Sequence, residues 1–139
     1  MLTRALFALA LICGTAGATF AENAKVVALG LADHEVTQEE LANGEVPPAP
    51  RFNSPGVAYA LVANLKKGDV IEIALVKGGA PLLRNTETLA GDQAKYLLQA
   101  GKRGVPAGGW PEGTYNAKLT ITRDGKPLIE QSSTPIPVD

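Results

Sequence analysis

The only histidine of the chain, His34, stands between two acidic residues, Asp33 and Glu35. An imidazole paired with a carboxylate is the proton shuttle of hydrolytic triads, which also need a nucleophile. No Gly-x-Ser-x-Gly sequence is present. The three serines fall in expected turns or near the C-terminus: Ser54, Ser132 and Ser133. The sequence therefore does not support a triad.

The same acidic cluster could instead hold a divalent cation. A specific metal site needs three or four ligands that converge from separate elements. No second histidine is available, and the one cysteine and one methionine lie in the first 13 residues. We interpret His34 as a solvated surface residue, with adventitious metal binding as the alternative.

Other catalytic or binding motifs are equally weak. Paired carboxylates could hydrolyse glycosides, but the candidate acids lie mostly at expected turns: Asp69, Glu72, Glu87, Asp92 and Glu112. The Gly78–Gly79 and Gly108–Gly109 pairs lack the Lys-Ser/Thr continuation of a phosphate-binding loop. With 13 basic and 14 acidic residues, the chain has no positive surplus that would indicate nucleic-acid binding. We predict a protein that is not an enzyme and has no catalytic, cofactor-binding or metal-binding residues.

The N-terminus has the pattern of a secretory signal peptide. Arg4 gives a positive start, residues 5–12 are apolar, and small residues follow. This apolar run is shorter than the roughly 20 residues that a membrane-spanning helix needs. We predict cleavage after Ala21, which leaves a cysteine-free chain, periplasmic or secreted, in which residues 22–139 form one domain. Lipidation at Cys13 is the rival interpretation, which the bulky Ile12 before it disfavours.

Short segments separated by Gly- and Pro-containing turns follow. Lys25–Ala32, Val70–Val76 and Pro81–Leu89 are predicted strands, and Val57–Leu65 places every second residue from Val57 to Leu65 on one face. Gln93–Ala100 is also predicted as a strand, although the glycine behind it could end a helix.

The clearest alternation is in Thr114–Arg123, where Tyr115 and every second residue after it are apolar. Asp124–Gly125 is a tight-turn pair, after which Lys126–Ser133 returns as the partner strand. Strands at intervals of about 8–12 residues predict an all-β antiparallel sandwich.

Residues 33–55 interrupt this pattern with an acidic, Pro-rich segment. Residues 22–50 contain six acids and one lysine, whereas residues 51–139 contain eleven bases and eight acids. Thr37 and Glu40 have the spacing of a capping box, so we predict a short helical turn near 37–42. The segment as a whole is predicted to be a solvated loop over a mildly basic body.

The run from Trp110 to Tyr115 (WPEGTY), followed by Asp124–Gly125–Lys126, resembles the last hairpin of immunoglobulin-like β-sandwich domains in bacterial exported proteins. The resemblance covers about residues 52–133, leaves no place for the 33–55 segment, and implies a fold without a particular activity. Trp110 would cover one end of the core, and the Tyr115 hydroxyl would find a backbone partner.

We predict an exported, non-enzymatic protein-binding or assembly module of the cell envelope, with no nucleic acid, cofactor or membrane span. The surfaces that we expect to bind are the Asp33–Pro55 segment and the Lys102–Trp110 loop, with strand addition at exposed edges as another route. Deletion of residues 36–50 should then leave a folded protein that has lost its partner. The alternative is a small-ligand or carbohydrate-binding domain that uses Trp110 and Tyr115.

Overall fold

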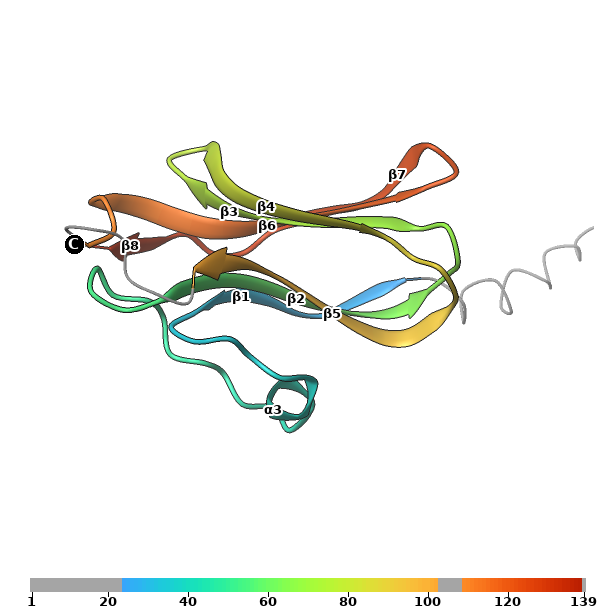
Figure 1. Cartoon of the computed structure of the whole chain (residues 1–139), viewed down its shortest axis with the longest axis horizontal. Helices are drawn as coiled ribbons and strands as arrows, with labels where there is room; N and C mark the ends of the chain where they lie inside the picture. The colour runs from blue at the N-terminus through green and yellow to red at the C-terminus, as the bar shows by residue number, and fades with distance from the viewer. Residues whose placement is uncertain (1–23, 103–108, 139) are drawn as a thin grey trace, which may run out of the picture.

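The computed structural model describes residues 24–102 and 109–138, which form two antiparallel sheets packed face to face (Figure 1). The first sheet has the order β1 (Lys25–Ala32), β2 (Gly56–Leu65), β5 (Gln93–Lys102). The second has the order β4 (Ala80–Thr88), β3 (Val70–Lys77), β6 (Gly113–Arg123), β7 (Lys126–Ser132), and β8 (Ile136–Val138) also pairs with β6. The predicted all-β sandwich is confirmed, and Gln93–Lys102 is a strand.

The main core lies between the two sheets, because alternate residues of the central strands point inward. The fully buried inward residues of these strands are Ala58, Ala60, Val62, Ile71, Ile73, Ala117, Leu119 and Ile121. Tyr115 begins this inward row on β6, as its alternation predicts. The other face of β6 carries threonines, an asparagine and a lysine, which remain in contact with solvent.

Strand β2 is buried on both faces, which its alternation did not predict. Ala58, Ala60 and Val62 belong to the main core, whereas Tyr59 and Leu61 face outward into a second, smaller core. Asn64 has a left-handed backbone (φ 64°), and after it Leu65 belongs to the main core. The prediction of one continuous face from Val57 to Leu65 is therefore wrong, because the side-chain period is broken at Asn64.

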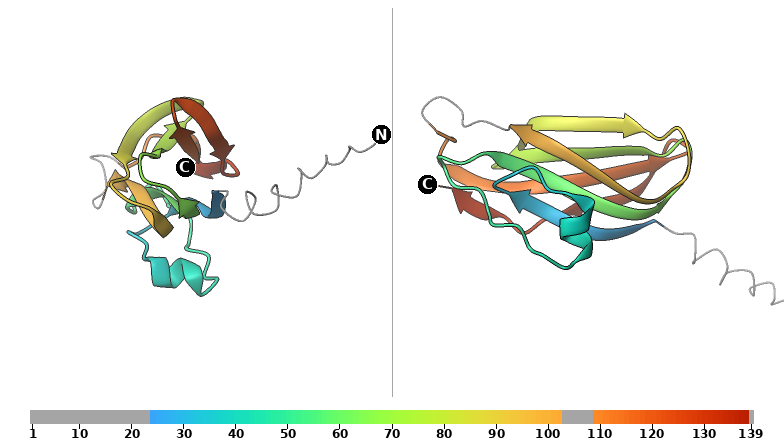
Figure 2. Two further views of the ribbon diagram at one scale, coloured as in Figure 1. Left: turned by 90° about the vertical axis from the view of Figure 1, so that its right-hand side faces the viewer. Right: turned by 60° about the horizontal axis from the view of Figure 1, so that its bottom comes forward.

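The second core is completed by the segment that follows β1, which folds over the outer face of the first sheet (Figure 2). Helix α3 (Gln38–Ala42) begins at the predicted capping box: Thr37 accepts from the Glu40 backbone N–H, and the Glu40 carboxylate accepts from the Thr37 N–H. Val36 and Leu41 are buried against Tyr59 and Leu61. None of the described helices is long and apolar enough to cross a membrane.

Hydrogen bonds attach this segment to β5 and also join its beginning to its end. The Gln99 side chain on β5 accepts from the Val36 N–H at 2.8 Å and donates to the Val36 carbonyl at 3.0 Å. The Asp33 N–H donates to the Pro48 carbonyl at 3.0 Å. The segment is mostly exposed, as predicted for a solvated loop, but the buried Val36 and Leu41 anchor it to the sheet, which the prediction did not include. Removing residues 36–50 would uncover the apolar side chains of Tyr59 and Leu61.

An ion pair joins the turn between β2 and β3 to the end of β6. Asp69, only 1% exposed, accepts two hydrogen bonds of 2.8 Å from the guanidinium of Arg123, at the end of β6. It also accepts from the Lys66 N–H at 2.9 Å. Chiefly because of the Arg123 hydrogen bonds, the pKa of Asp69 is lowered. The next turn, Asp124–Gly125, has two positive φ angles, 54° and 77°, as the predicted tight hairpin requires.

Besides the short β8, the two sheets have four outer strands in the described part of the chain, and three of these four contain an extra, unpaired residue. The register passes over Val27 in β1, Leu82 in β4 and Leu128 in β7. These three side chains are exposed, because a bulged residue lies outside the regular ladder. The fourth outer strand, β5, is joined to β4 by a hydrogen bond of 2.8 Å from the Asn85 side chain to the Gln99 carbonyl.

Candidate functional site

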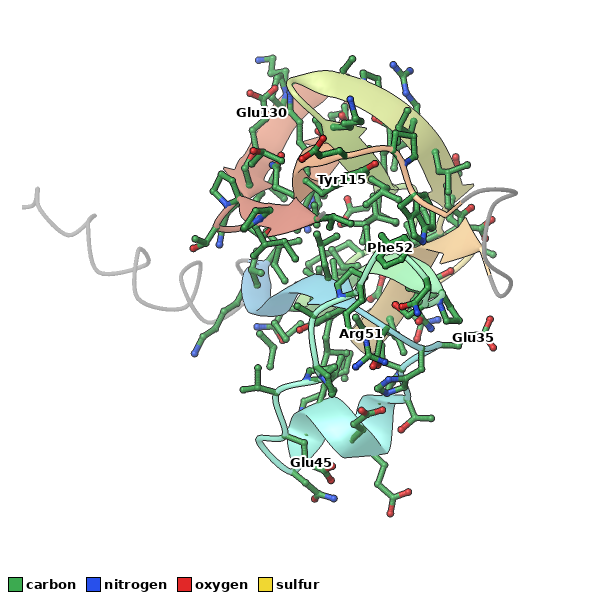
Figure 3. All side chains as sticks on the ribbon, turned by 90° about the vertical axis from the view of Figure 1, so that its left-hand side faces the viewer. Glu35, Glu45, Arg51, Phe52, Tyr115 and Glu130 are labelled. Carbon is green, nitrogen blue, oxygen red and sulfur yellow. The ribbon has the colours of Figure 1, made fainter. Side chains whose placement is uncertain are left out.

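Trp110 and Tyr115 are part of the core. Trp110 is 8% exposed and donates from its indole nitrogen to the Ser54 carbonyl at 2.8 Å. Tyr115 is 2% exposed, donates its hydroxyl to the Pro111 carbonyl, and lies at 81° to the indole ring (Figure 3). Burial raises the pKa of Tyr115. Because the two rings are enclosed, they offer no open surface on which a ligand could stack.

His34 is held between two carboxylates. Its Nδ1 lies 2.7 Å from Asp33 Oδ1 and its Nε2 lies 2.7 Å from Glu40 Oε2. Ionised carboxylates only accept hydrogen bonds, so both ring nitrogens must donate, which requires the protonated imidazolium. These hydrogen bonds, first that of Asp33 and then that of Glu40, raise the pKa of His34. The second carboxylate is therefore that of Glu40 in α3, six residues after His34. The sequence alone had pointed to Glu35, the neighbour of His34 in the chain.

This arrangement fastens α3 to the end of β1 and provides no catalytic base, because both ring nitrogens are already engaged. The imidazole has no serine partner either. The Ser54 hydroxyl forms hydrogen bonds with the backbone of Arg51 and Pro55, and the Ser133 hydroxyl accepts a hydrogen bond from the Ala117 N–H. In the described ranges, no group of three or more His, Cys, Asp or Glu residues could hold a metal ion.

Three of the candidate acidic residues have structural partners, and Glu72 lies within β3 and not at a turn. Asp69 forms the buried pair with Arg123, Asp92 accepts from the Lys67 N–H at 2.8 Å, and Glu72 accepts from the Thr86 hydroxyl at 3.1 Å. Of the two segments expected to bind, residues 33–50 cover the first sheet. Within the Lys102–Trp110 loop, residues 103–108 lie outside the described part of the chain.

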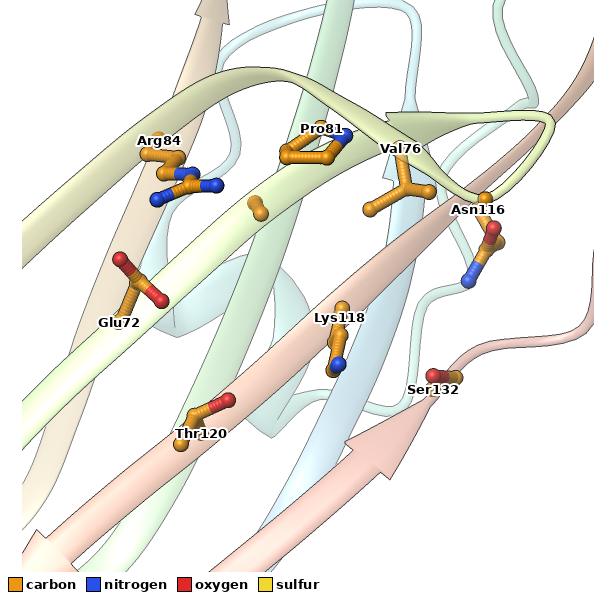
Figure 4. A pocket seen from close by; sticks show the side chains of 10 residues that line it. Glu72, Val76, Pro81, Arg84, Asn116, Lys118, Thr120 and Ser132 are labelled. Carbon is orange, nitrogen blue, oxygen red and sulfur yellow. The ribbon is translucent and has the colours of Figure 1, made fainter.

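The outer face of the second sheet is uncovered and hollowed. A cavity of about 400 Å³ opens on this face, above β3 and β6 and between β4 and β7 (Figure 4). Its base contains two small apolar side chains, Ala74 and Val76, which are 6% and 7% exposed. Its rim is polar and includes Glu72, Arg84 and Lys118.

The strand register arranges these side chains in rows across the sheet. One row consists of Arg84, Ala74, Lys118 and Ser132 on β4, β3, β6 and β7. The next row consists of Thr86, Glu72, Thr120 and Glu130. The first row therefore carries two positive charges and the second carries two negative charges. In the described part of the chain, neither Arg84 nor Lys118 forms an ion pair.

Sequence reasoning missed this face, although one signal was present. The run from Val70 to Val76 is apolar at six of its seven positions, with Glu72 the exception. A strand with one face in water should alternate, so Ala74 and Val76 indicate that part of its outer face is shielded. The charged rows could not be found, because they depend on which residues of β4, β6 and β7 stand opposite each other.

A scan of models of protein families found no match to this chain, and a search of curated proteins found none either.

Proposed function

We propose that this protein is an exported, non-enzymatic binding module of the cell envelope, and that it holds a partner protein on the outer face of the sheet that contains β4, β3, β6 and β7. The observation that carries the proposal is the asymmetry of the two outer faces. The segment from residue 33 to residue 50 covers the face of the β1–β2–β5 sheet. The opposite face has a cavity of about 400 Å³ with an apolar base and a charged rim.

Such a face combines the features of a protein-recognition surface. Its shielded apolar residues, Ala74 and Val76, lie at the centre, and hydrogen-bonding and charged side chains surround them. The outward residues of β3, β4, β6 and β7 include no aromatic ring in the described ranges, which favours a polypeptide over a sugar that would stack on a ring.

Export and fold class are part of the same proposal. The N-terminal pattern up to Ala21 supports cleavage and passage into the periplasm or the medium. The strand order supports membership of the immunoglobulin-like class. The sheets β1–β2–β5 and β4–β3–β6–β7 follow the A–B–E and C′–C–F–G arrangement of such sandwiches. A hydroxyl bond from Tyr115 to a carbonyl four residues upstream, at the start of the sixth strand, is also typical of them.

Site-specific photocrosslinking in the native cells tests the proposed face. A photoreactive amino acid replaces Thr120, which lines the cavity, and in a matched variant it replaces Glu39, which is exposed on α3 at the opposite side. We expect a discrete adduct with one protein from position 120 and none from position 39. Absence of an adduct at position 120, or the same adduct from both positions, would contradict the proposal.

A further inference from the structure

The two charged rows suggest the chemistry of the partner. Neighbouring strands are about 4.8 Å apart, so the backbones of Arg84 and Lys118 lie about 10 Å from each other across β3. In the strand register only Ala74, with its methyl side chain, stands between them. Two cations that flank a small residue leave space for one anionic group between them.

A carboxylate fits this position best. The planar guanidinium of Arg84 can donate two parallel hydrogen bonds to a carboxylate, and the ammonium of Lys118 adds a compact charge from the other side. The hydroxyl of Ser132 continues the row beyond Lys118. Because both cations are exposed and have no ion-pair partner in the described ranges, a ligand need not displace an internal contact to reach them.

The second row has the opposite requirement. Glu72 and Glu130 flank Thr120 on β6 in the same way as Arg84 and Lys118 flank Ala74 on β3. The centre of this row is displaced from the first by one strand and by two residues along the strands. These displacements are about 4.8 Å and 6.7 Å, so the two centres are about 8 Å apart. A run of acids would meet repulsion here, whereas a cation would be attracted.

We infer that this face binds an extended segment of a partner protein in which an Asp or Glu and a Lys or Arg stand two residues apart. In an extended chain, residues i and i+2 lie on the same face about 6.7 Å apart, and their side chains easily span the remaining distance. The acid occupies the space between Arg84 and Lys118, and the base occupies the space between Glu72 and Glu130. This inference rests on the proposed function and specifies its partner.

Titration by NMR tests the charge pattern directly. The exported protein is titrated with a capped peptide of sequence Thr-Glu-Thr-Lys-Thr, with Thr-Gln-Thr-Gln-Thr as the neutral control. We expect saturable shifts at the amides of Ala74, Lys118 and Thr120, and binding about fivefold to tenfold tighter than for the neutral peptide, the product of two exposed charge contacts. The double variant Arg84→Gln, Lys118→Gln removes the acid-binding contact and keeps Glu72 and Glu130, so it should reduce this preference to about twofold to threefold, the effect of one exposed charge contact.

Three outcomes would overturn the inference: equal affinity for the two peptides, shifts confined to another surface, or no saturable shift up to ~10 mM peptide, ten times the Kd of a ~1 mM contact. The crosslinking experiment separates these outcomes from failure of the proposed function. If position 120 crosslinks to a partner and the peptides show no charge dependence, only the charge pattern is refuted. If position 120 does not crosslink, the proposed function itself is refuted.

Discussion

Replacing Arg123 with glutamine should destabilise the protein by about 3 kcal/mol. The reason is that the variant leaves the carboxylate of Asp69 buried, at 1% exposure, with the Lys66 N–H as its remaining protein donor. Removing one partner of a buried pair costs about 3–5 kcal/mol, and the 25% exposure of the Arg123 side chain places this pair at the lower end. The loss would be a large fraction of a typical stability of about 5–15 kcal/mol.

The same variant should weaken the loss of stability that the wild-type protein shows in acid. In the wild-type protein the pKa of Asp69 is lowered, so the ionised carboxylate adds to the free energy of unfolding. This contribution is complete above the unfolded-state pKa near 3.8 and is lost as the pH falls through the lower folded-state pKa. Without the Arg123 hydrogen bonds, which are the largest cause of the lowered value, the pKa of Asp69 should rise from its wild-type position, because the desolvation that opposes them remains. Acidification then relieves the buried charge, and the difference in unfolding free energy between variant and wild type should shrink.

Urea unfolding at several pH values between 3 and 7 measures both effects. Arg84→Gln is the matched control, because Arg84 is exposed and forms no ion pair with the described residues; it should change stability by less than about 0.5 kcal/mol. Adding Asp69→Asn to Arg123→Gln should recover part of the loss, since no buried charge remains. A cost below about 1 kcal/mol for Arg123→Gln, with an unchanged acid response, would refute this account of the pair.

Three further outcomes are expected. His34→Gln should lower stability by at most about 1 kcal/mol, because the side chain is 41% exposed. This loss should be complete below pH 6.5 and should vanish as the pH rises through the raised pKa of His34. A loss of stability in urea unfolding that does not depend on pH would contradict this expectation. Leu41→Ala should lower the free energy of unfolding by about 2 kcal/mol, because it removes a buried side chain of the second core. Glu39→Ala, on the exposed side of α3, should leave it nearly unchanged. Equal effects of the two substitutions in urea unfolding would show that α3 does not pack as described. The intact mass of the protein from native cells should correspond to a chain that begins at Glu22, and a mass that includes residues 1–21 would refute cleavage.

Features determined by neighbouring residues could be predicted from the sequence. The capping box of Thr37 and Glu40 and the hairpin at Asp124–Gly125 each depend on side chains and backbone within a few positions. The strand at Thr114–Arg123 was equally clear, because one of its faces is apolar and the other is in water. The inward position of Tyr115 follows from that alternation.

Features determined by distant residues could not be predicted. Strand β2 is apolar on both faces, so its sequence holds no polar period from which to assign the main core, and the left-handed Asn64 changes the assignment near its end. The pairing of Asp69 with Arg123 joins positions 54 apart. The charged rows of the candidate face require the register of four strands, which is set by the bulges at Leu82 and Leu128 as much as by the turns.

The bulges in the outer strands have a consequence for how this protein can associate. An incoming strand needs an uninterrupted series of N–H and C=O groups, and the bulges at Val27, Leu82 and Leu128 interrupt three of the outer strands. The protein should therefore resist edge-to-edge polymerisation even when it is crowded. A partner of the kind proposed above would contact side chains of the sheet face and not the main chain of an edge strand. Recognition of that kind is altered by single substitutions, so relatives of one scaffold could diverge in specificity without any change in their sheets.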